Sequence, residues 1–267
     1  MLNYNSIAAE ARKTVLDLIY KAQTSHIGSN FSIIDIMTVL FEKIDLDKDK
    51  FILSAGWKAA AFYYFLWRKG KITTKELESY CQPNSKWIGL SEPVHKDIPF
   101  AGGSMGMGLP AAIGFALAKK LKYESGTIYV LMSDGEFQCG TTWESFLIAA
   151  QLKLNNLIVI CDNNGLQAMG KTSDILLLPF KELSTQRKLA GWHIKTINGH
   201  NYQQIERALT DETPLELDYS LYDMPWLIIA NTIKGKGVSF MEGNNEWHYR
   251  APEKTEYEQA MKELCQF

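Results

Sequence analysis

The sequence has few features that would place the protein in an oxidising compartment or in a membrane. Its cysteines (Cys81, Cys139, Cys161 and Cys265) lie far apart without metal-type spacing, so none is an obvious zinc ligand. No apolar run approaches the length of a membrane span, and charged residues interrupt the apolar pattern of the first twenty residues, unlike a signal peptide. We therefore expect a reduced, cytoplasmic protein.

The sequence also lacks an excess of charge of one sign. Its 28 Lys and Arg residues and 30 Asp and Glu residues give a formal charge of −2, with no block of like charges. This balance gives no electrostatic reason to expect nucleic acid or an anionic membrane as a partner. A chain of 267 residues with 46% hydrophobic content can bury a large core. We expect one soluble domain, 1–267, that acts on a small molecule.

Strand-like and helix-like segments alternate along the chain, with no internal repeat or low-complexity linker. This alternation predicts an α/β fold with a doubly wound, mostly parallel sheet and helices on both faces. Loops are expected at 24–30 and in the glycine-rich segment 102–108. The expected strands are 51–53, 127–132, 157–161, 192–197 and 226–231, and the expected helices are 7–22, 32–41, 59–68, 109–120, and segments beginning near 141, 202 and 255.

Two of the expected strands end in a short polar turn that contains glycine. The strand at 127–132 is followed by Asp134 and Gly135, and the strand at 157–161 by Asn164. In a βαβ unit the carboxyl ends of both strands lie on one edge of the sheet, so the two turns should converge. Mg²⁺ takes oxygen ligands from one or two protein groups, phosphate and water. The pair predicts a diphosphate and metal site, although either turn alone is typical of an ordinary βα loop.

Other features of this region suit a phosphate group. Gly135 has no side chain where a phosphate would approach the backbone, and glycines at 102–108 allow a similar approach. The helix expected from Thr141 or Thr142 would place partial positive charge nearby. These features support the diphosphate prediction.

With these motifs the sequence resembles the N-terminal half of transketolases. The thiamine diphosphate motif of that family usually reads Gly-Asp-Gly, followed by an Asn after the next strand. The resemblance extends over nearly the whole chain. The residues that carry it are SDG at 133–135, NNG at 163–165, Trp143-Glu144, LKL at 152–154, and the segments around His26 and His248.

The resemblance implies a thiamine-diphosphate-binding fold of the PP type and a set of cofactor ligands. The cofactor would be thiamine diphosphate with Mg²⁺, or Ca²⁺ or Mn²⁺ in its place. The expected metal ligands are Asp134, Asn164 and the backbone carbonyl of Leu166. The residues expected to contact the cofactor are Gly106, Met107, Asp134, Gly135, Asn164 and Trp57.

Three residues are expected to be catalytic by the same resemblance. His26 and His248 match the transketolase histidines near the transferred sugar. An imidazole titrates near neutrality and suits proton movement around a carbonyl. Glu144 is the third, and it is retained although Cys139 stands where many members have a glutamate. The other histidines have different expected roles: His200 is structural, His193 belongs to a strand, and the role of His95 is open.

The sequence departs from the family pattern around the expected cofactor and substrate. Trp57 replaces a histidine, and an indole can donate a hydrogen bond but cannot accept a proton. Ser133 replaces the first glycine of Gly-Asp-Gly. Met105 and Met107 replace the more usual Leu and a polar residue, which softens that wall. These changes indicate an altered substrate preference or weakened catalysis.

The function implied is transfer of a two-carbon ketol unit from a ketose to an aldose, with the cofactor as electron sink. In the family a glutamate from a separate pyrimidine-binding domain activates the cofactor. Because this chain ends at Phe267, that domain is expected on a partner, the C-terminal transketolase subunit, in a heterodimer or heterotetramer. Two alternatives stay open. One is another thiamine-diphosphate reaction, such as a deoxyxylulose-phosphate-synthase-like condensation or a specialised ketol transfer; the other is a non-catalytic regulatory subunit. The donor and acceptor sugars, and any phosphate preference, are undetermined.

Overall fold

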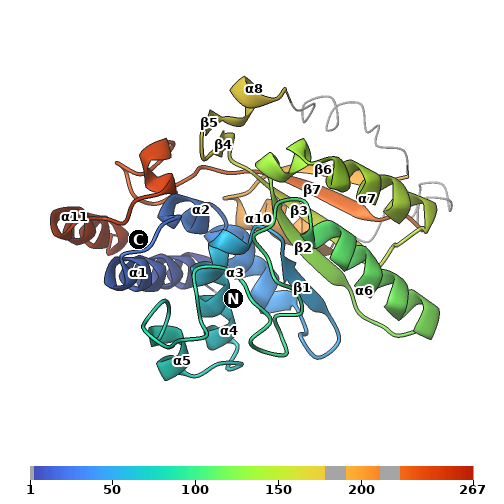
Figure 1. Ribbon diagram of the computed structural model, residues 1–267, viewed down its shortest axis with the longest axis horizontal. Helices are drawn as coiled ribbons and strands as arrows, with labels where there is room; N and C mark the ends of the chain where they lie inside the picture. The colour runs from blue at the N-terminus through green and yellow to red at the C-terminus, as the bar shows by residue number, and fades with distance from the viewer. Residues whose placement is uncertain (1–2, 178–190, 211–222, 267) are drawn as a thin grey trace.

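The centre of the protein is a parallel sheet of five strands in the order β1-β2-β3-β7-β6 (Figure 1). The computed structural model describes residues 3–177, 191–210 and 223–266. One row of the register crosses the whole sheet and pairs Ile52, Val130, Val159, Leu227 and Ile194. The strands are β1 (Lys50–Leu53), β2 (Ile128–Ser133), β3 (Leu157–Asn163), β6 (His193–Asn198) and β7 (Trp226–Asn231), with a separate antiparallel pair of β4 (Leu166–Gln167) and β5 (Gly170–Lys171).

Helices cover both faces of the sheet, as the sequence predicts. Figure 1 shows α6 and α7 on one side and α1, α3 and α4 on the other. Helix α11 packs against α1. The helices are α1 (Tyr4–Ala22), α2 (Ile27–Ser32), α3 (Ile34–Lys43), α4 (Ala59–Arg68), α5 (Thr74–Glu78), α6 (Gly108–Lys122), α7 (Gly140–Gln151), α8 (Thr172–Ile175), α10 (Tyr202–Thr210) and α11 (Lys254–Leu264).

Strand β2 shows why the central strands are continuously apolar. Successive side chains of a strand point to opposite faces, and here both faces are covered by helices. Val130 and Met132 belong to the core under α6 and α7, whereas Leu131 belongs to the core under α1, α3 and α4. Each fully buried aliphatic side chain of this kind contributes about 1.5–3 kcal/mol to folding. The two cores fix the register of the sheet.

The segment after α1 differs from the sequence-based expectation. The loop expected at 24–30 is wrong, because Ile27–Ser32 forms helix α2 and its residues are buried. The helix expected at 32–41 is found as α3, but it begins two residues later, at Ile34, because Ile33 separates it from α2. Glycine, serine and asparagine are weak helix formers. Burial of this segment, with the backbone N–H of His26 donating to the carbonyl of His248 at 2.9 Å, overrides that propensity.

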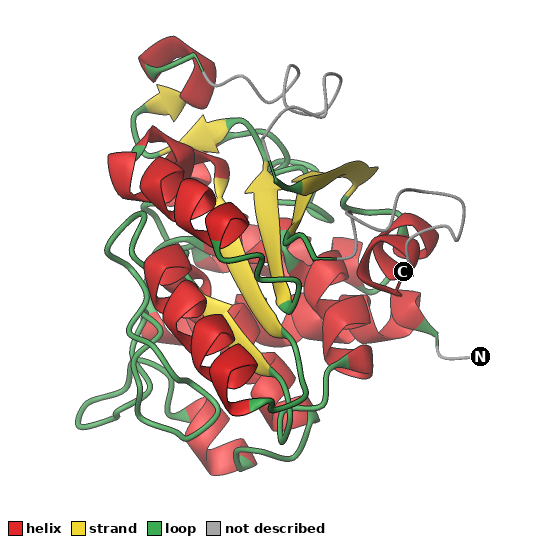
Figure 2. Ribbon diagram, turned by 90° about the vertical axis from the view of Figure 1, so that its right-hand side faces the viewer, coloured by secondary structure: helices red, strands yellow, loops and turns green. Residues whose placement is uncertain are grey.

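The carboxyl ends of β2 and β3 point toward the small β4–β5 pair and α8, which lie beyond the sheet (Figure 2). The backbone changes direction immediately after each of these two strands. After β2 it forms a 3₁₀ helix, η2 (Asp134–Gln138), and after β3 it enters the β4–β5 turn. Both polar turns predicted from the sequence therefore lie at this edge of the sheet. Within residues 3–177, 191–210 and 223–266, no helix is both long and apolar enough to cross a membrane.

Candidate active site

A cavity of about 350 Å³ opens at the carboxyl ends of β2 and β3. It brings together side chains from both halves of the sequence. Its wall is formed by His26, Ser29, Trp57, Lys58, Gly103, Met105, Ser133, Asp134, Gly135, Asn164, Leu166, Gln167, Ala168, Met169, His248 and Tyr249. Of the expected site residues, Gly106, Met107 and Glu144 are not part of this wall.

The turns after β2 and β3 are joined by direct hydrogen bonds. Asp134 Oδ1 accepts from the N–H of Gly135 at 2.9 Å, and its Oδ2 accepts from the N–H of Gly165 at 2.7 Å. Burial and the nearby Asp162 carboxylate raise the pKa of Asp134 to about 7. A buried carboxylate held in this way is destabilised by its surroundings, and a cation would relieve that cost.

Asn164 lines the same cavity as Asp134, and two contacts orient its amide. Its Oδ1 accepts from the N–H of Leu166 at 3.0 Å, and its Nδ2 donates to Asp162 Oδ2 at 2.9 Å. An amide oxygen has two lone pairs, so Oδ1 can accept a second partner. The structure thus places the three expected metal ligands, Asp134, Asn164 and Leu166, around one cavity.

Several observations fit a diphosphate and a divalent cation in this cavity. Gln167 Oε1 is buried in the wall and has no hydrogen-bond partner among the described residues. A Cβ at Gly135 would lie 3.3 Å from Met105 Cε and 3.5 Å from Gln167 Oε1, so a side chain there would crowd the cavity. No cluster of three or more His, Cys, Asp or Glu residues within the described part of the chain could hold a metal. A cation would therefore need an amide, a carbonyl and phosphate oxygens besides Asp134, which suits Mg²⁺.

His26 and His248 come from opposite ends of the sequence and meet at the cavity. Their ring centroids lie 4.9 Å apart, and Ser25 Oγ lies 2.6 Å from His26 Nδ1. Burial, together with the charges of Lys234 and Lys58, lowers the pKa of His26 to about 4. Burial and the charge of Lys234 lower the pKa of His248 further, to about 3. Both rings are therefore neutral at pH 7. A neutral imidazole can act as donor and acceptor.

Lys234 does not line the cavity but contacts its His248, and the sequence analysis did not select it. It is 1% exposed, and its Nζ lies 2.6 Å from His248 Nδ1 and 3.0 Å from Asn245 Oδ1. Among the ion pairs of the described residues none involves Lys234. An ammonium group can only donate, so Nδ1 of His248 is the acceptor and Nε2 carries the proton. The only sequence signal was a lysine in a glycine-bearing loop, which is too common to select.

Replacing Lys234 by methionine is expected to raise the pKa of His248 from about 3 toward its ordinary value of 6.5. The pKa should stay below 6.5, because burial remains the largest cause of the shift and the charges of His26 and Lys58 also remain. The pKa can be measured by NMR titration of the imidazole nitrogens. Lys236→Met is the control, since Lys236 pairs with Glu242. An unchanged pKa in Lys234→Met would show that Lys234 does not control His248.

The glycine-rich loop before α6 approaches the turn after β2 closely. Gly106 has φ +76°, and a Cβ on it would lie 2.7 Å from the Cβ of Cys139. Its N–H donates to the buried Glu136 Oε1 at 3.2 Å. Met107 is exposed directly before α6, whereas Met105 lines the cavity. The cofactor contacts of Gly106 and Met107 stay predictions.

The remaining expected residues lie in different surroundings. Trp57 lines the cavity, with its ring centroid 6.4 Å from that of His26. Glu144 is exposed on α7, so its catalytic role stays a prediction. His95 lies 3.6 Å from Asp97 and against Trp87, and it is not part of the cavity wall.

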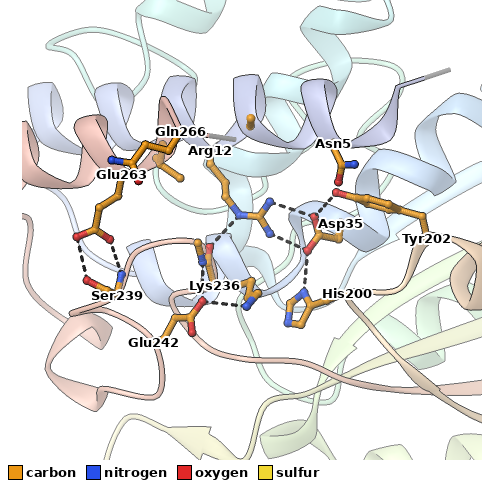
Figure 3. Close-up of a pocket in the computed structure, with 13 residues that line it drawn as sticks. Asn5, Arg12, Asp35, His200, Tyr202, Lys236, Ser239, Glu242, Glu263 and Gln266 are labelled. Carbon is orange, nitrogen blue, oxygen red and sulfur yellow. Dashed lines mark hydrogen bonds and ion pairs between the residues drawn. The ribbon is translucent and has the colours of Figure 1, made fainter.

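A second, larger cavity of about 790 Å³ lies between α1, α10, α11 and the loop at 236–242 (Figure 3). Its wall contains Asp35, which is 4% exposed. Asp35 pairs with both terminal nitrogens of Arg12 at 3.0 and 2.7 Å, with His200 Nδ1 at 2.7 Å, and accepts from Tyr202 Oη at 2.9 Å. The side chains of this hub satisfy one another, which is typical of a structural network.

The Asp35 hub also holds the segment that carries Lys234. The N–H of Ile233 donates to His200 Nε2 at 2.8 Å. Arg12 Nε donates to the carbonyl of Lys236 at 2.8 Å (Figure 3). Hydrogen bonds to the Asp35 hub thus hold the backbone on both sides of Lys234, outside the cavity that His26 and His248 line. His200 lies in this hub and away from the cavity that His26 lines.

The fold and the cavity define an α/β protein whose ligand site lies at the carboxyl ends of parallel strands. Residues 4–266 match the family described as transketolase, thiamine diphosphate binding domain. The chain therefore belongs to the transketolase family, and it corresponds to the N-terminal, thiamine-diphosphate-binding domain of transketolases. The resemblance and the fold class predicted from the sequence are confirmed.

Named relatives and a solved structure agree with this assignment. The chain is 34% identical over 279 residues to an apulose-4-phosphate transketolase subunit of Actinobacillus succinogenes, with 98% of this chain and 97% of that protein covered. It is 32% identical over 268 residues to the 6-deoxy-6-sulfo-D-fructose transketolase subunit SqwG of a Clostridium species, with 95% and 93% covered. The transketolase structure from Campylobacter jejuni matches with a TM-score of 0.87 and 26% identity. That match covers 99% of this chain but spans only 43% of the Campylobacter chain.

Proposed function

We propose that this chain is the N-terminal subunit of a split transketolase, a transferase that moves a two-carbon ketol unit from a ketose to an aldose. The observation that carries the proposal is the convergence of Asp134, Asn164, His26 and His248 on one cavity. The two relatives named as subunits are covered over 97% and 93% of their length, whereas the solved transketolase is covered over 43%. These coverages support a chain that corresponds to one separately encoded half.

The cavity residues divide between cofactor binding and substrate handling. Asp134, Asn164 and the carbonyl of Leu166 would hold a divalent cation, Mg²⁺ or else Ca²⁺ or Mn²⁺, and through it the diphosphate. Gly135 leaves room for the diphosphate at the end of β2. When bound, thiamine diphosphate supplies the electron sink for breaking and forming the carbon–carbon bond. Trp57 closes one side of the cavity and can donate one hydrogen bond.

The two histidines would handle protons and hydroxyl groups of the sugar. Lys234 holds His248 with its proton on Nε2, so this ring is set to donate a hydrogen bond to a sugar oxygen. His26 shares a hydrogen bond with Ser25 through Nδ1, which leaves Nε2 for the substrate. Neutral rings suit hydrogen bonding to sugar hydroxyl and carbonyl groups, because a neutral imidazole has one donor and one acceptor nitrogen. Burial and the nearby lysine charges, which lower both pKa values, disfavour a charged imidazolium at either position.

The partner would be a C-terminal transketolase subunit that carries the pyrimidine-binding domain, in a heterodimer or heterotetramer. Glu144 is exposed on α7 and away from the cavity, so a catalytic role would require contact with that partner. The free cysteines fit a reducing, cytoplasmic location. The substrate class we propose is a ketose or ketose phosphate.

A specialised ketol transfer is the second candidate, and Trp57 favours it. The indole lines the cavity beside His26 and cannot accept a proton. It also fills space that a smaller imidazole would leave open to substrate. Activity assays with phosphorylated and unphosphorylated acceptors would separate this candidate from an ordinary pentose-phosphate specificity.

The chain alone is expected to bind thiamine diphosphate weakly and to transfer no ketol unit. The mixture with its partner is expected to bind the cofactor tightly and to transfer the ketol unit. The reason is that the pyrimidine half of the cofactor would be held by the partner. Calorimetric titration of thiamine diphosphate with Mg²⁺, into the chain alone and into the mixture, measures the difference. The partner tested is a protein encoded beside this chain that carries the pyrimidine-binding half.

The control for this experiment is the same mixture made with Asp134→Ala, which should bind no cofactor in a Mg²⁺-dependent way. Robust ketol transfer by the chain alone would contradict the split enzyme. Absence of binding in the chain and in the mixture would support the non-catalytic role instead.

A further inference from the structure

Lys58 is a fully buried cation in the wall of the candidate cofactor cavity. Its relative exposure is 0%, and it ends the 3₁₀ helix η1 (Gly56–Lys58), directly after Trp57. It forms an ion pair with Asp162, whose side chain is also 0% exposed. Lysine is rarely buried without a specific partner, so this pair requires an explanation.

Asp162 is the centre of a small polar network behind the metal-ligand turn. Ser32 Oγ donates to its Oδ2 at 2.7 Å, and Thr232 Oγ1 donates to its Oδ1. The third donor, besides Lys58, is Asn164 Nδ2 at 2.9 Å. Asp162 thus joins α2, η1, the end of β7 and the turn after β3 at one carboxylate.

The contact with Asp162 decides which way the Asn164 amide faces. An amide nitrogen can only donate and an amide oxygen can only accept. With Nδ2 bonded to the Asp162 carboxylate, Oδ1 lies on the opposite side of the amide, beside the N–H of Leu166. Nδ2 is thus engaged by Asp162, and Oδ1 is the amide atom that would be left for a cation.

The carboxylate of Asp162 depends on Lys58 for its charge balance. Asp134 lies in the same region, and the two carboxylates repel each other. A buried ion that loses its partner leaves an uncompensated charge, which is strongly unfavourable. Without the ammonium group, water or another arrangement of side chains would have to replace it, and the Asn164 contact would be disturbed.

We propose that Lys58 is a positioning residue for the cation site: it keeps Asp162 paired, and Asp162 in turn holds the Asn164 amide with its oxygen available to the metal. The proposal rests on the proposed function of the cavity. Lys58, which lies 106 positions before Asn164 in the sequence, would then influence the metal site without being a ligand itself. A lysine that instead contacted the diphosphate directly would give a different result in the following test.

The test measures the Mg²⁺ concentration needed for thiamine diphosphate binding, by calorimetry on the complex with the partner subunit. Lys58→Met should raise this concentration about 10- to 100-fold, the usual effect of removing a residue that orients a metal ligand. In Lys58→Met/Asp162→Asn the amide at 162 can still accept from Asn164 and no charge is left unpaired. The double variant should therefore recover most of the lost affinity. Lys71→Met is the control, because Lys71 pairs with the exposed Asp47.

Each outcome of the test is decisive. Equal Mg²⁺ requirements in the wild type and in Lys58→Met would overturn the role of Lys58. A folded double variant as weak as Lys58→Met would also overturn it, since that result indicates direct contact of Lys58 with the diphosphate. If Lys58→Met does not fold, the Mg²⁺ requirement of the double variant is compared with that of the wild type. A requirement close to that of the wild type supports the role of Lys58, and a large increase overturns it. A wild-type complex that binds no cofactor would contradict the proposed function itself, which is a separate result.

Discussion

Replacing Asp134 by alanine is expected to abolish Mg²⁺-dependent binding of thiamine diphosphate, with an affinity loss of at least about 100-fold. Removal of residues that only orient a ligand costs about 10- to 100-fold, so removal of the single carboxylate among the proposed ligands should cost no less. Asp134 is 1% exposed and lies where the turns after β2 and β3 meet. Calorimetry of the assembled complex with and without Mg²⁺ measures the effect.

Asp47→Asn is the control for this experiment, because Asp47 is exposed and pairs only with Lys71 among the ion pairs of the described residues. Thermal unfolding of Asp134→Ala shows whether the domain is intact, since the N–H groups of Gly135 and Gly165 lose their acceptor. A folded variant with unchanged Mg²⁺-dependent affinity would refute the metal assignment.

Replacing Asp35 by asparagine is expected to destabilise the folded chain by about 3–5 kcal/mol, the usual cost of breaking a buried ion pair. Asparagine keeps the shape of the side chain but leaves the Arg12 guanidinium, 7% exposed, without a counter-charge. Equilibrium unfolding in urea measures the change in free energy. Asp47→Asn is again the control, and an exposed pair of this kind should contribute less than about 1 kcal/mol.

The pH dependence of the Asp35→Asn effect follows from the direction of the pKa shift. Burial alone would raise the pKa of Asp35, but the charge of Arg12 and the hydrogen bond from His200 hold it well below its usual 3.8. The stabilisation is therefore fully present above pH 3.8 and is lost as the pH falls toward the folded-state pKa. The difference between wild type and variant measured at pH 7 should shrink as the pH falls below 4. A difference below about 1 kcal/mol at pH 7 would show that the hub is not a stability element.

Long segments with one clear pattern were the most predictable part of the fold. Helix α4 and strand β7 have the bounds expected from their aromatic and β-branched runs. Helix α2 was missed, because glycine, serine and asparagine read as a loop locally and only burial beneath the cavity makes them helical. The β4–β5 pair was also missed, since two-residue strands have no periodicity that a sequence can show.

The candidate site was predictable where its residues follow strand ends. Asp134 and Asn164 were selected because the carboxyl ends of parallel strands meet at one edge, whatever the details of packing. Lys58 and Lys234 were not selected, because lysine is usually a surface residue. Asp162 lies at the end of β3 two positions before Asn164, but no local pattern shows that it binds Lys58. Their importance depends on partners far away in the sequence, such as the pairing of Lys58 with Asp162.

The amino-acid sequence by itself determined the class of fold, the order of its main elements and the two turns at the end of β2 and β3, because apolar periodicity and turn chemistry are local properties. Only the tertiary structure decided which ionisable groups lose their water and which partners they gain. That is why the buried pairing of Lys58, the proton position on His248 and the Asp35 hub emerge from the structure. These properties depend on burial and on distances between residues remote in sequence, which no local pattern encodes.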